Sequence, residues 1–156
     1  MKNQKTLSVS AIENGTVIDH IPAENLFKAI SILGLDHLTE NQITFGYNFN
    51  SKRLGKKAII KIADKFFQDI EIDKIALVAP NAKLNIIKNY EVVEKRQVNV
   101  PQNIVGIVKC MNPKCITNHE DIQTKFTVIN TDKISLKCCY CEKATNIEHI
   151  KLVKQD

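Results

Sequence analysis

The sequence lacks the glycine-rich loops with which many enzymes hold nucleotides. Its five glycines, at positions 15, 34, 46, 55 and 106, form neither a G-x-x-x-x-G-K-[ST] loop nor a G-x-G-x-x-G turn. Any bound phosphate must therefore be held by side chains. Tryptophan is absent, and three tyrosines and six phenylalanines leave little material for stacking nucleic-acid bases.

Long apolar runs are also missing. No stretch approaches the length of about 20 apolar residues that a membrane-spanning helix needs. The first five residues, MKNQK, do not begin the apolar core of a secretion signal. We expect a soluble, cytoplasmic protein of 156 residues without a membrane partner.

The positive charge is spread thinly. The formal net charge of +5 divides into +3 for residues 1–101 and +2 for residues 102–156. This modest excess favours one compact anionic ligand over a long phosphate backbone, so no nucleic-acid partner is expected.

The cysteines divide the chain into two modules. All five lie between positions 110 and 141, and the first hundred residues contain none. The polar stretch around Pro101 separates two apolar, strand-like runs. We therefore expect domains at residues 1–100 and 101–156, with a linker over residues 96–103.

The first module alternates strand-like and helix-like patterns. A helix is expected from Pro22 to Gly34, with an apolar face of Leu26, Ile30 and Leu33, and another over residues 69–77, before Pro80. Strands are expected at residues 7–11, 16–18, 43–49, 57–62, 83–87 and 90–93, with a turn at residues 88–89. The pattern predicts an α+β fold, a mostly antiparallel sheet with two helices on one side, as in a ferredoxin-like sandwich.

The residue patterns of the second module are almost entirely typical of strands. Strands are expected at residues 104–109, 125–129, 134–137 and 147–153. About 55 residues with few large side chains bury too little apolar surface to be stable alone. A small all-β, zinc-ribbon-like domain therefore needs another source of stability.

The cysteine spacing supplies that source. Cys110-x4-Cys115 and Cys138-x2-Cys141 form two close pairs that each follow an expected strand. Two such knuckles place four thiolates around one structural zinc ion, which leaves no open position for catalysis. Two alternatives remain: a disulfide framework, which suits exported chains, and a redox Cys-x-x-Cys, which leaves the first pair without a role.

Three other side chains near the knuckles are expected to stay outside the metal shell. The spacing makes Cys139 a free, outward-facing thiol, because only Cys138 and Cys141 have the two-residue separation of a knuckle. His119 and His149 are interpreted as surface residues, since four thiolates already close the shell.

A second group of residues suits an anion. Asp19-His20 is a polar pair between apolar neighbours, and Lys57 and Lys61 lie four apart on one strand, hence on one face and about 13 Å apart. Lys95 adds a cation if its strand is a neighbour. The alternative is equally simple, because paired lysines on a solvent face often serve only solubility, and spacing alone does not decide between the two.

A family resemblance adds to this reading. Several segments, in order and with nearly constant spacing from about residue 7 to about residue 153, resemble the regulatory chain of aspartate carbamoyltransferase. They are GTVIDHIPA at residues 15–23, residues 57–62, Ala79-Pro80, NYEVV at residues 89–93, and the cysteines at 110, 115, 138 and 141. The nine-residue run is the most specific of them.

The resemblance implies a non-catalytic subunit of pyrimidine biosynthesis. An N-terminal allosteric domain would bind CTP or UTP as inhibitors and ATP as an activator. A C-terminal zinc domain would contact the catalytic chain. Dimers of the regulatory chain would join catalytic trimers into an assembly of six chains of each kind.

The same resemblance assigns nine residues to the nucleotide. They run from base to phosphate: Ala11, Ile12 and Tyr90 at the base, Asp19 and Lys61 at the ribose, His20, Lys95 and Val92 at the phosphates, and Lys57 at the edge. The alternative function, from a different class, is a zinc-ribbon nucleic-acid-binding protein.

Overall fold

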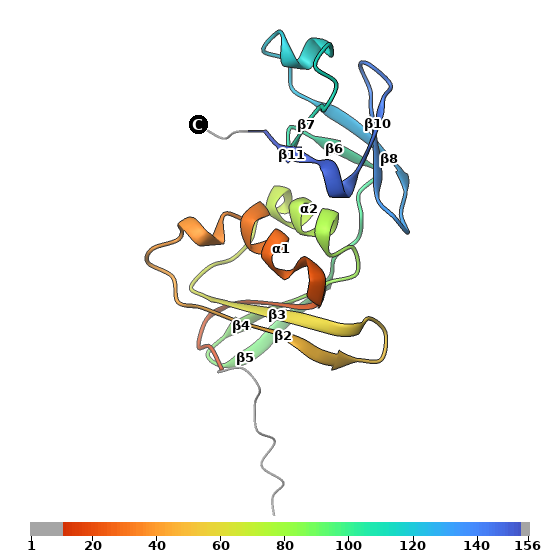
Figure 1. Ribbon diagram of the computed structural model, residues 1–156. Coiled ribbons are helices and arrows are strands. Elements are labelled where there is room, and N and C mark those ends of the chain that lie inside the picture. The colour runs from red at the N-terminus through yellow and green to blue at the C-terminus, as the bar shows by residue number, and fades with distance from the viewer. Residues whose placement is uncertain (1–10, 154–156) are drawn as a thin grey trace, which may run out of the picture. The chain divides into compact units, whose positions relative to one another are not determined.

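The computed structural model describes residues 11–153, which divide into two compact units after Val98. The first unit contains a five-stranded sheet and two α-helices, and the second contains short strands (Figure 1). The strand expected at residues 7–11 falls almost entirely outside the described residues.

The sheet of the first unit has the order β2-β3-β1-β4-β5, with every neighbouring pair antiparallel. Its strands are β1 (Gly15–Pro22), β2 (Ile43–Ser51), β3 (Gly55–Ala63), β4 (Lys83–Lys88) and β5 (Glu91–Gln97). With α1 (Leu26–Ile32) and α2 (Asp69–Val78), the order β-α-β-β-α-β of a ferredoxin-like fold is complete, followed by one extra strand. The predicted α+β class is confirmed.

Gly15 fixes where the central strand begins. A Cβ atom there would lie 2.1 Å from the Ile62 carbonyl oxygen of the neighbouring strand, and its φ of +141° is open only to glycine without strain. Strand β1 therefore starts in close contact with β3, which leaves no room for a side chain at this position.

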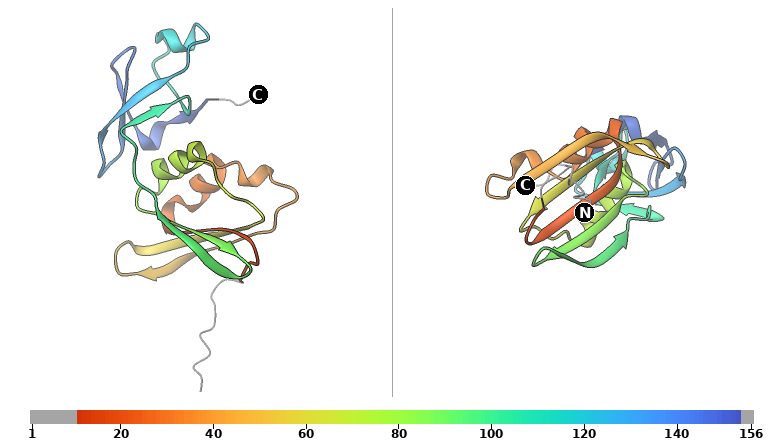
Figure 2. Two further views of the ribbon diagram at one scale, coloured as in Figure 1. Left: turned by 180° about the vertical axis from the view of Figure 1, so that it is seen from behind. Right: turned by 90° about the horizontal axis from the view of Figure 1, so that it is seen from below.

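Both helices cover the same face of the sheet, as the two opposite views in Figures 1 and 2 show. The covered face carries the buried core residues Ile18, Ile60 and Leu84. The side-chain amide of Asn25 donates to the carbonyl of Val78 at 2.9 Å and ties the two helices together. The helix expected from Pro22 begins with a 3-10 turn, η1 (Ala23–Asn25).

The buried face of α1 differs from the prediction. Leu26, Ala29 and Ile32 are buried, whereas Ile30 and Leu33 are only half-buried. The spacing i, i+3, i+6 replaces i, i+4, i+7 because the helix is only seven residues long and small Ala29 lets it approach the sheet.

The end of the first unit also departs from the predicted linker. Strand β5 continues to Gln97, and Val98 is 1% exposed, with its N–H donating to the Ala82 carbonyl at 2.8 Å. The predicted linker therefore started about three residues too early. The turn between β4 and β5 contains Asn89 and Tyr90, so Tyr90 is a turn residue and not part of the strand.

The second unit is built from short strands. A four-stranded sheet has the order β10-β9-β8-β6, and a separate ladder joins β11 to β7. The strands are β6 (Asn103–Val105), β7 (Val108–Lys109), β8 (Lys125–Asn130), β9 (Ser135–Cys138), β10 (Ala144–Asn146) and β11 (Lys151–Leu152). The predicted all-β class is confirmed.

Two predicted strands of this unit are wrong in detail. The run over residues 104–109 breaks at Gly106, whose φ of +72° turns the chain between β6 and β7. The run over residues 147–153 begins with a 3-10 turn, η4 (Ile147–His149), before β11. Strand β10 was not predicted, because Ala144-Thr145-Asn146 has no apolar alternation.

Candidate functional site

Four cysteine side chains of the second unit meet at one point. The Sγ atoms of Cys110, Cys115, Cys138 and Cys141 all lie within 4.8 Å of one another. Cys110 and Cys141 are 3.6 Å apart, and Cys115 and Cys138 are 3.8 Å apart. Four sulfurs bonded to one ion at about 2.3 Å are separated by about 3.8 Å, so the cluster fits a tetrahedral metal site.

Backbone and side-chain hydrogen bonds hold the first knuckle in shape. The amide of Asn118 donates to the carbonyls of Cys110 and Asn112, at 2.9 and 2.8 Å. The N–H of Cys115 donates to the Asn112 carbonyl at 3.0 Å. In the second knuckle the N–H of Glu142 donates to the Cys138 carbonyl at 2.9 Å, and a left-handed Glu142 closes the turn. The four thiols are thus positioned by their own loops.

The environment divides the thiols into two kinds. Burial raises the pKa of Cys110 to about 12, although the backbone of Asn112 opposes this. Burial would also raise the pKa of Cys141, but hydrogen bonds from the Lys143 backbone and the Asn112 side chain lower it to about 7. A buried thiol cluster of this kind is stable when a cation neutralises the charge of its thiolates.

The neighbouring candidates stay outside the cluster, as predicted. Cys139 is exposed, while its neighbour Cys138 is buried. His119 is also exposed, and its Nε2 lies 2.8 Å from the Pro113 carbonyl oxygen. His149 is exposed at the end of η4. Among the described residues no disulfide is formed, and all five cysteines are free.

In the first unit, the face of the sheet without helices carries a row of residues paired across its strands. Lys61 on β3 is opposite Val17 on β1, Val17 is opposite Asn85 on β4, and Asn85 is opposite Lys95 on β5. Directly opposed residues project from the same face, so this face presents a lysine on each side of the central strands. The pairing of Lys95 with a neighbouring strand, on which its predicted role depended, is present.

Asp19 lies at the centre of a small charged group near the end of β1. Its carboxylate lies 3.0 Å from the Lys57 ammonium and 3.4 Å from His20 Nδ1. The N–H of His20 donates to Asp19 Oδ1 at 2.6 Å, and His20 has a left-handed φ of +62° within a bulge of the strand. Strained backbone of this kind is concentrated at binding sites.

His20 is kept neutral by its surroundings. Burial lowers its pKa, the carboxylate of Asp19 raises it, and the positive charges of Lys57, Lys83 and Arg53 lower it further. Nδ1 is shielded from solvent and has no hydrogen-bond partner in the described part of the chain. Burial likewise lowers the pKa of Lys61. Groups whose pKa values are shifted in this way favour an anion that would compensate them.

The residues expected at the base lie at the opposite end of β1. Ala11, Ile12 and Tyr90 line one open hollow of about 260 Å³. The N–H of Tyr90 donates to the carbonyl of Glu13 at 2.9 Å, which joins the β4–β5 turn to the segment before β1. Val92 pairs with Ile87, which in turn pairs with Gly15, and therefore lies in the row next to this hollow.

The structure thus brings the predicted residues together in three groups: Asp19, His20 and Lys57 near the end of β1, Lys61, Lys95 and Val92 in rows paired across the sheet, and Ala11, Ile12 and Tyr90 at one hollow. Two basic neighbours, Arg53 and Lys83, were not predicted from the sequence, although both lower the pKa of His20. Lys83 could have been found only by knowing that β4 pairs with β1, because 64 residues separate it from Asp19.

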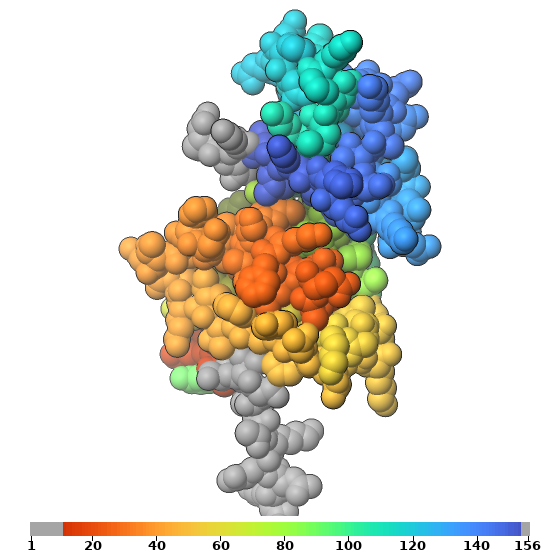
Figure 3. All heavy atoms as spheres, in the orientation of Figure 1, coloured from red at the N-terminus to blue at the C-terminus, as the bar shows by residue number. Residues whose placement is uncertain are grey.

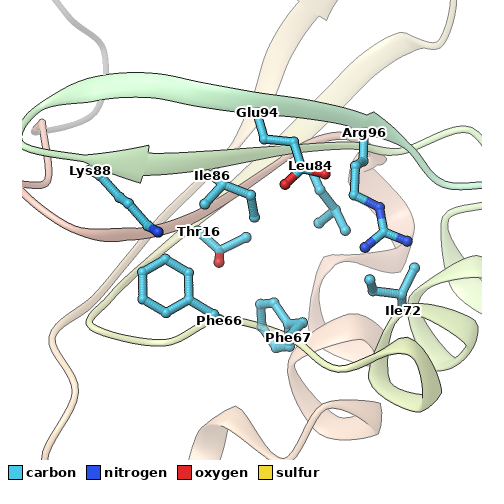
Figure 4. Close-up of a pocket in the computed structure, with 9 residues that line it drawn as sticks. All are labelled: Thr16, Phe66, Phe67, Ile72, Leu84, Ile86, Lys88, Glu94 and Arg96. Carbon is cyan, nitrogen blue, oxygen red and sulfur yellow. The ribbon is translucent and has the colours of Figure 1, made fainter.

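Another hollow, of about 300 Å³, opens on the helix side of β4 and β5 (Figure 4). Phe66 and Phe67 lie below the strands, with Lys88 at one end and Arg96 at the other. The Lys88 ammonium lies 5.8 Å from the centre of the Phe66 ring. None of the nine predicted nucleotide residues lines this hollow, so it is separate from the basic face.

Taken together, the fold and sites define a protein of two units, with a basic face on the first and a four-cysteine cluster suited to a metal ion in the second. Comparison with known proteins gives the family. Residues 7–99 match the family model "aspartate carbamoyltransferase regulatory chain, allosteric domain", and residues 102–151 match its metal binding domain.

Comparison with individual relatives supports the same family. The chain is 57% identical to the aspartate carbamoyltransferase regulatory chain of Bacteroides fragilis over 152 residues, 97% of this chain and 99% of the relative. It is 52% identical to the regulatory chain of Pyrococcus horikoshii over 145 residues, 92% and 95% of the two chains. The chain belongs to the family of aspartate carbamoyltransferase regulatory chains and is a non-catalytic subunit.

This membership has two further consequences. A regulatory chain of aspartate carbamoyltransferase has a catalytic chain as its partner, and the nucleic-acid alternative is not favoured. Among the described residues, no helix combines the length and apolar character required to cross a bilayer.

Proposed function

We propose that the first unit binds CTP or UTP as inhibitors and ATP as an activator of the catalytic trimers. The observation that carries this proposal is the basic face on which Lys61 and Lys95 flank the central strands and lead to His20. A protein without a glycine-rich loop needs side-chain cations to hold the phosphates of a nucleotide. Each cation contributes about 1.5–3 kcal/mol through charge-assisted hydrogen bonds.

The nine residues would contact different parts of one nucleotide. The base would occupy the hollow of Ala11, Ile12 and Tyr90, where the two bases must be told apart because CTP and ATP carry the same triphosphate. Asp19 and Lys61 would contact the ribose region. The phosphates would meet His20 and Lys95, with Val92 beside them and Lys57 at the edge.

We infer that the metal of the second unit is one structural zinc ion per chain. Four thiolates and a closed tetrahedral shell suit zinc, and they leave no position for a substrate. Reduced cysteines also agree with a cytoplasmic protein. With zinc bound, a thiol reagent should modify only Cys139, and a chelator should raise the count to five thiols; a count of five before chelation contradicts the site.

We propose that the zinc unit contacts the catalytic chain and that two regulatory chains form a dimer joining two trimers. An exposed aromatic cluster supports a dimer surface. Phe27 of α1 lies with its ring centre 6.3 Å from that of Phe45 and 6.0 Å from that of Tyr47, both on the edge strand β2. The segments of α1 and β2 are visible on the face shown in Figure 3. An unpaired strand edge beside exposed aromatic rings favours pairing with a second copy.

Regulation then requires only a difference in affinity. A nucleotide that binds one quaternary state more tightly shifts the assembly toward that state, typically by about 1–3 kcal/mol. The test is to combine the chain with its catalytic trimer and measure aspartate saturation with and without CTP. CTP should raise the aspartate concentration needed for half-maximal rate.

The Lys61→Ala variant sharpens this test. It should assemble normally and lose most of the response to CTP, because a cation of the binding face is removed. Lys88→Ala, which removes a lysine from the Figure 4 hollow, is the matched control and should respond like the parent chain. Loss of assembly in Lys61→Ala would instead assign Lys61 a structural role.

A further inference from the structure

The two knuckles of the cysteine cluster are closed in different ways. The second has two residues between its cysteines, and a backbone hydrogen bond closes it, from the N–H of Glu142 to the Cys138 carbonyl at 2.9 Å. The first has four residues between its cysteines. Its backbone hydrogen bond, from the N–H of Cys115 to the Asn112 carbonyl at 3.0 Å, spans only the later part of the knuckle. The earlier part, from Cys110 to Asn112, is held by a side chain from outside the knuckle.

That side chain belongs to Asn118. Its amide nitrogen donates to the carbonyls of Cys110 and Asn112, at 2.9 and 2.8 Å. Asn118 is half-buried at the end of the 3-10 turn η3 (Ile116–Asn118), and its own backbone N–H donates to the Cys115 carbonyl at 2.9 Å. One residue therefore hydrogen-bonds both cysteines of the first knuckle, one through its side chain and the other through its backbone.

The shape of the first knuckle determines how the two halves of the metal shell meet. Cys110 Sγ lies 3.6 Å from Cys141 Sγ, and Cys115 Sγ lies 3.8 Å from Cys138 Sγ, so both contacts join one knuckle to the other. If the segment before Asn112 were free, the metal ion would have to order it on binding, at a cost in conformational entropy. A knuckle that is already closed avoids this cost, and hydrogen bonds to the ligand residues commonly have this effect in metal sites.

We propose that Asn118 is a positioning residue of the metal shell and raises the affinity for the metal by holding the first knuckle closed. The proposal rests on the structural zinc ion proposed above. Loss of the amide hydrogens should weaken metal binding. It should loosen Cys110 in particular, because the carbonyl of Cys110 accepts one of the two side-chain hydrogen bonds.

Competition between the full chain and a chelating indicator for zinc measures the affinity. Asn118→Ala removes the amide, and Asn118→Asp keeps the shape of the side chain but replaces the donating nitrogen with an oxygen. Each variant should bind zinc about ten- to hundredfold more weakly than the parent chain. Weakening in Asn118→Asp alone would assign the effect to the added charge and overturn the role of the hydrogen bonds.

Asn130→Asp is the matched control in the same unit. The side-chain oxygen of Asn130, at the end of β8, accepts hydrogen bonds from the N–H groups of Asp132 and Lys133, at 3.0 and 3.3 Å. Aspartate retains such an oxygen, so this variant adds the same charge and keeps both hydrogen bonds. It should bind zinc like the parent chain.

A second measurement separates positioning from general stability. While a chelator slowly removes the metal, alkylated cysteines are assigned by mass spectrometry. In Asn118→Ala, Cys110 should be modified before Cys138 and Cys141, whereas in the parent chain the three should become reactive together. Simultaneous modification in the variant would contradict the proposal.

Two further outcomes are decisive. Amide hydrogen exchange at saturating zinc verifies that the variants fold, and a second unit that stays unfolded there would assign Asn118 to the fold instead of the metal shell. If the parent chain binds zinc and both Asn118 variants bind it equally tightly, only the role of Asn118 is refuted. If the parent chain binds no zinc, the proposed metal site fails as well.

Discussion

The two units of this chain reach stability by different routes. The first unit surrounds a continuous apolar core, with Ile18, Leu26, Ile60 and Leu84 at most 1% exposed. The second has fewer large buried side chains, centred on Phe126, and gathers four thiols beside them. We therefore expect apolar burial to stabilise the first unit and a bound metal ion to stabilise the second, so the two should respond differently to metal removal and to core substitutions.

Metal removal should produce the largest effect. Structural zinc contributes about 10–16 kcal/mol to the folding of small modules, so chelation or Cys115→Ser should unfold the second unit and abolish association with the catalytic trimer. Amide hydrogen exchange on the full chain measures this unit by unit: protection should be lost over residues 99–153 and kept over β1, β3 and β4.

The control for this experiment is Cys139→Ser, which removes the exposed neighbouring thiol. It should retain the metal, the protection and the assembly. A Cys115→Ser variant that still assembles at full strength would contradict the organising role of the metal.

A cavity in the first unit should have a smaller effect on stability than metal removal, and it should affect the first unit instead of the second. Ile60→Ala removes a side chain that is 0% exposed beneath the helices and should destabilise the first unit by about 2–5 kcal/mol. Denaturant unfolding should show the loss, while the metal content stays the same. Equal loss of protection in both units would mean that they fold as one, and would remove the contrast between them.

The smallest effect concerns pH. The pKa of His20 is lowered from 6.5 by burial and by Lys57, Lys83 and Arg53, against the opposing effect of Asp19. Because protonation is disfavoured in the folded chain, its stabilising contribution is complete above pH 6.5 and falls as the pH drops through and below that value. Phosphates bound beside His20 should reverse the balance and raise its pKa, because their negative charge favours the protonated imidazole.

Nucleotide affinity should therefore increase as the pH falls below 6.5, with proton uptake on binding. Calorimetry in two buffers of different ionisation enthalpy measures that uptake. His20→Gln should bind more weakly and lose the pH dependence. A pH profile that survives in His20→Gln would assign the proton to another group.

Features that depend on neighbouring residues could be predicted from the sequence, whereas features that depend on distant residues could not. Helix α2 and strands β1 to β3 were predicted because apolar periodicity and the breaker Pro80 act within a few residues. The metal cluster was found for the same reason, since each knuckle is a local pair. Strand β10 and the break at Gly106 were missed because neither changes the apolar pattern.

The basic face could be predicted only in part from the sequence, because its residues come from different strands. Lys61 and Lys95 come together because β1 and β4 lie between their strands, and that order is determined by the burial of the whole sheet. Lys83 acquires its position opposite Asp19 in the same way. Spacing along the chain can propose cations, but only strand pairing decides which of them share a face.

The anchoring of Val98 has a mechanical consequence. The side chain of Val98 is buried in the core, and its backbone N–H donates a hydrogen bond to the carbonyl of Ala82, the residue directly before β4. The polypeptide therefore leaves the sheet at a fixed point, three residues beyond Lys95. We expect a displacement of β5 to be transmitted to the peptide that follows it.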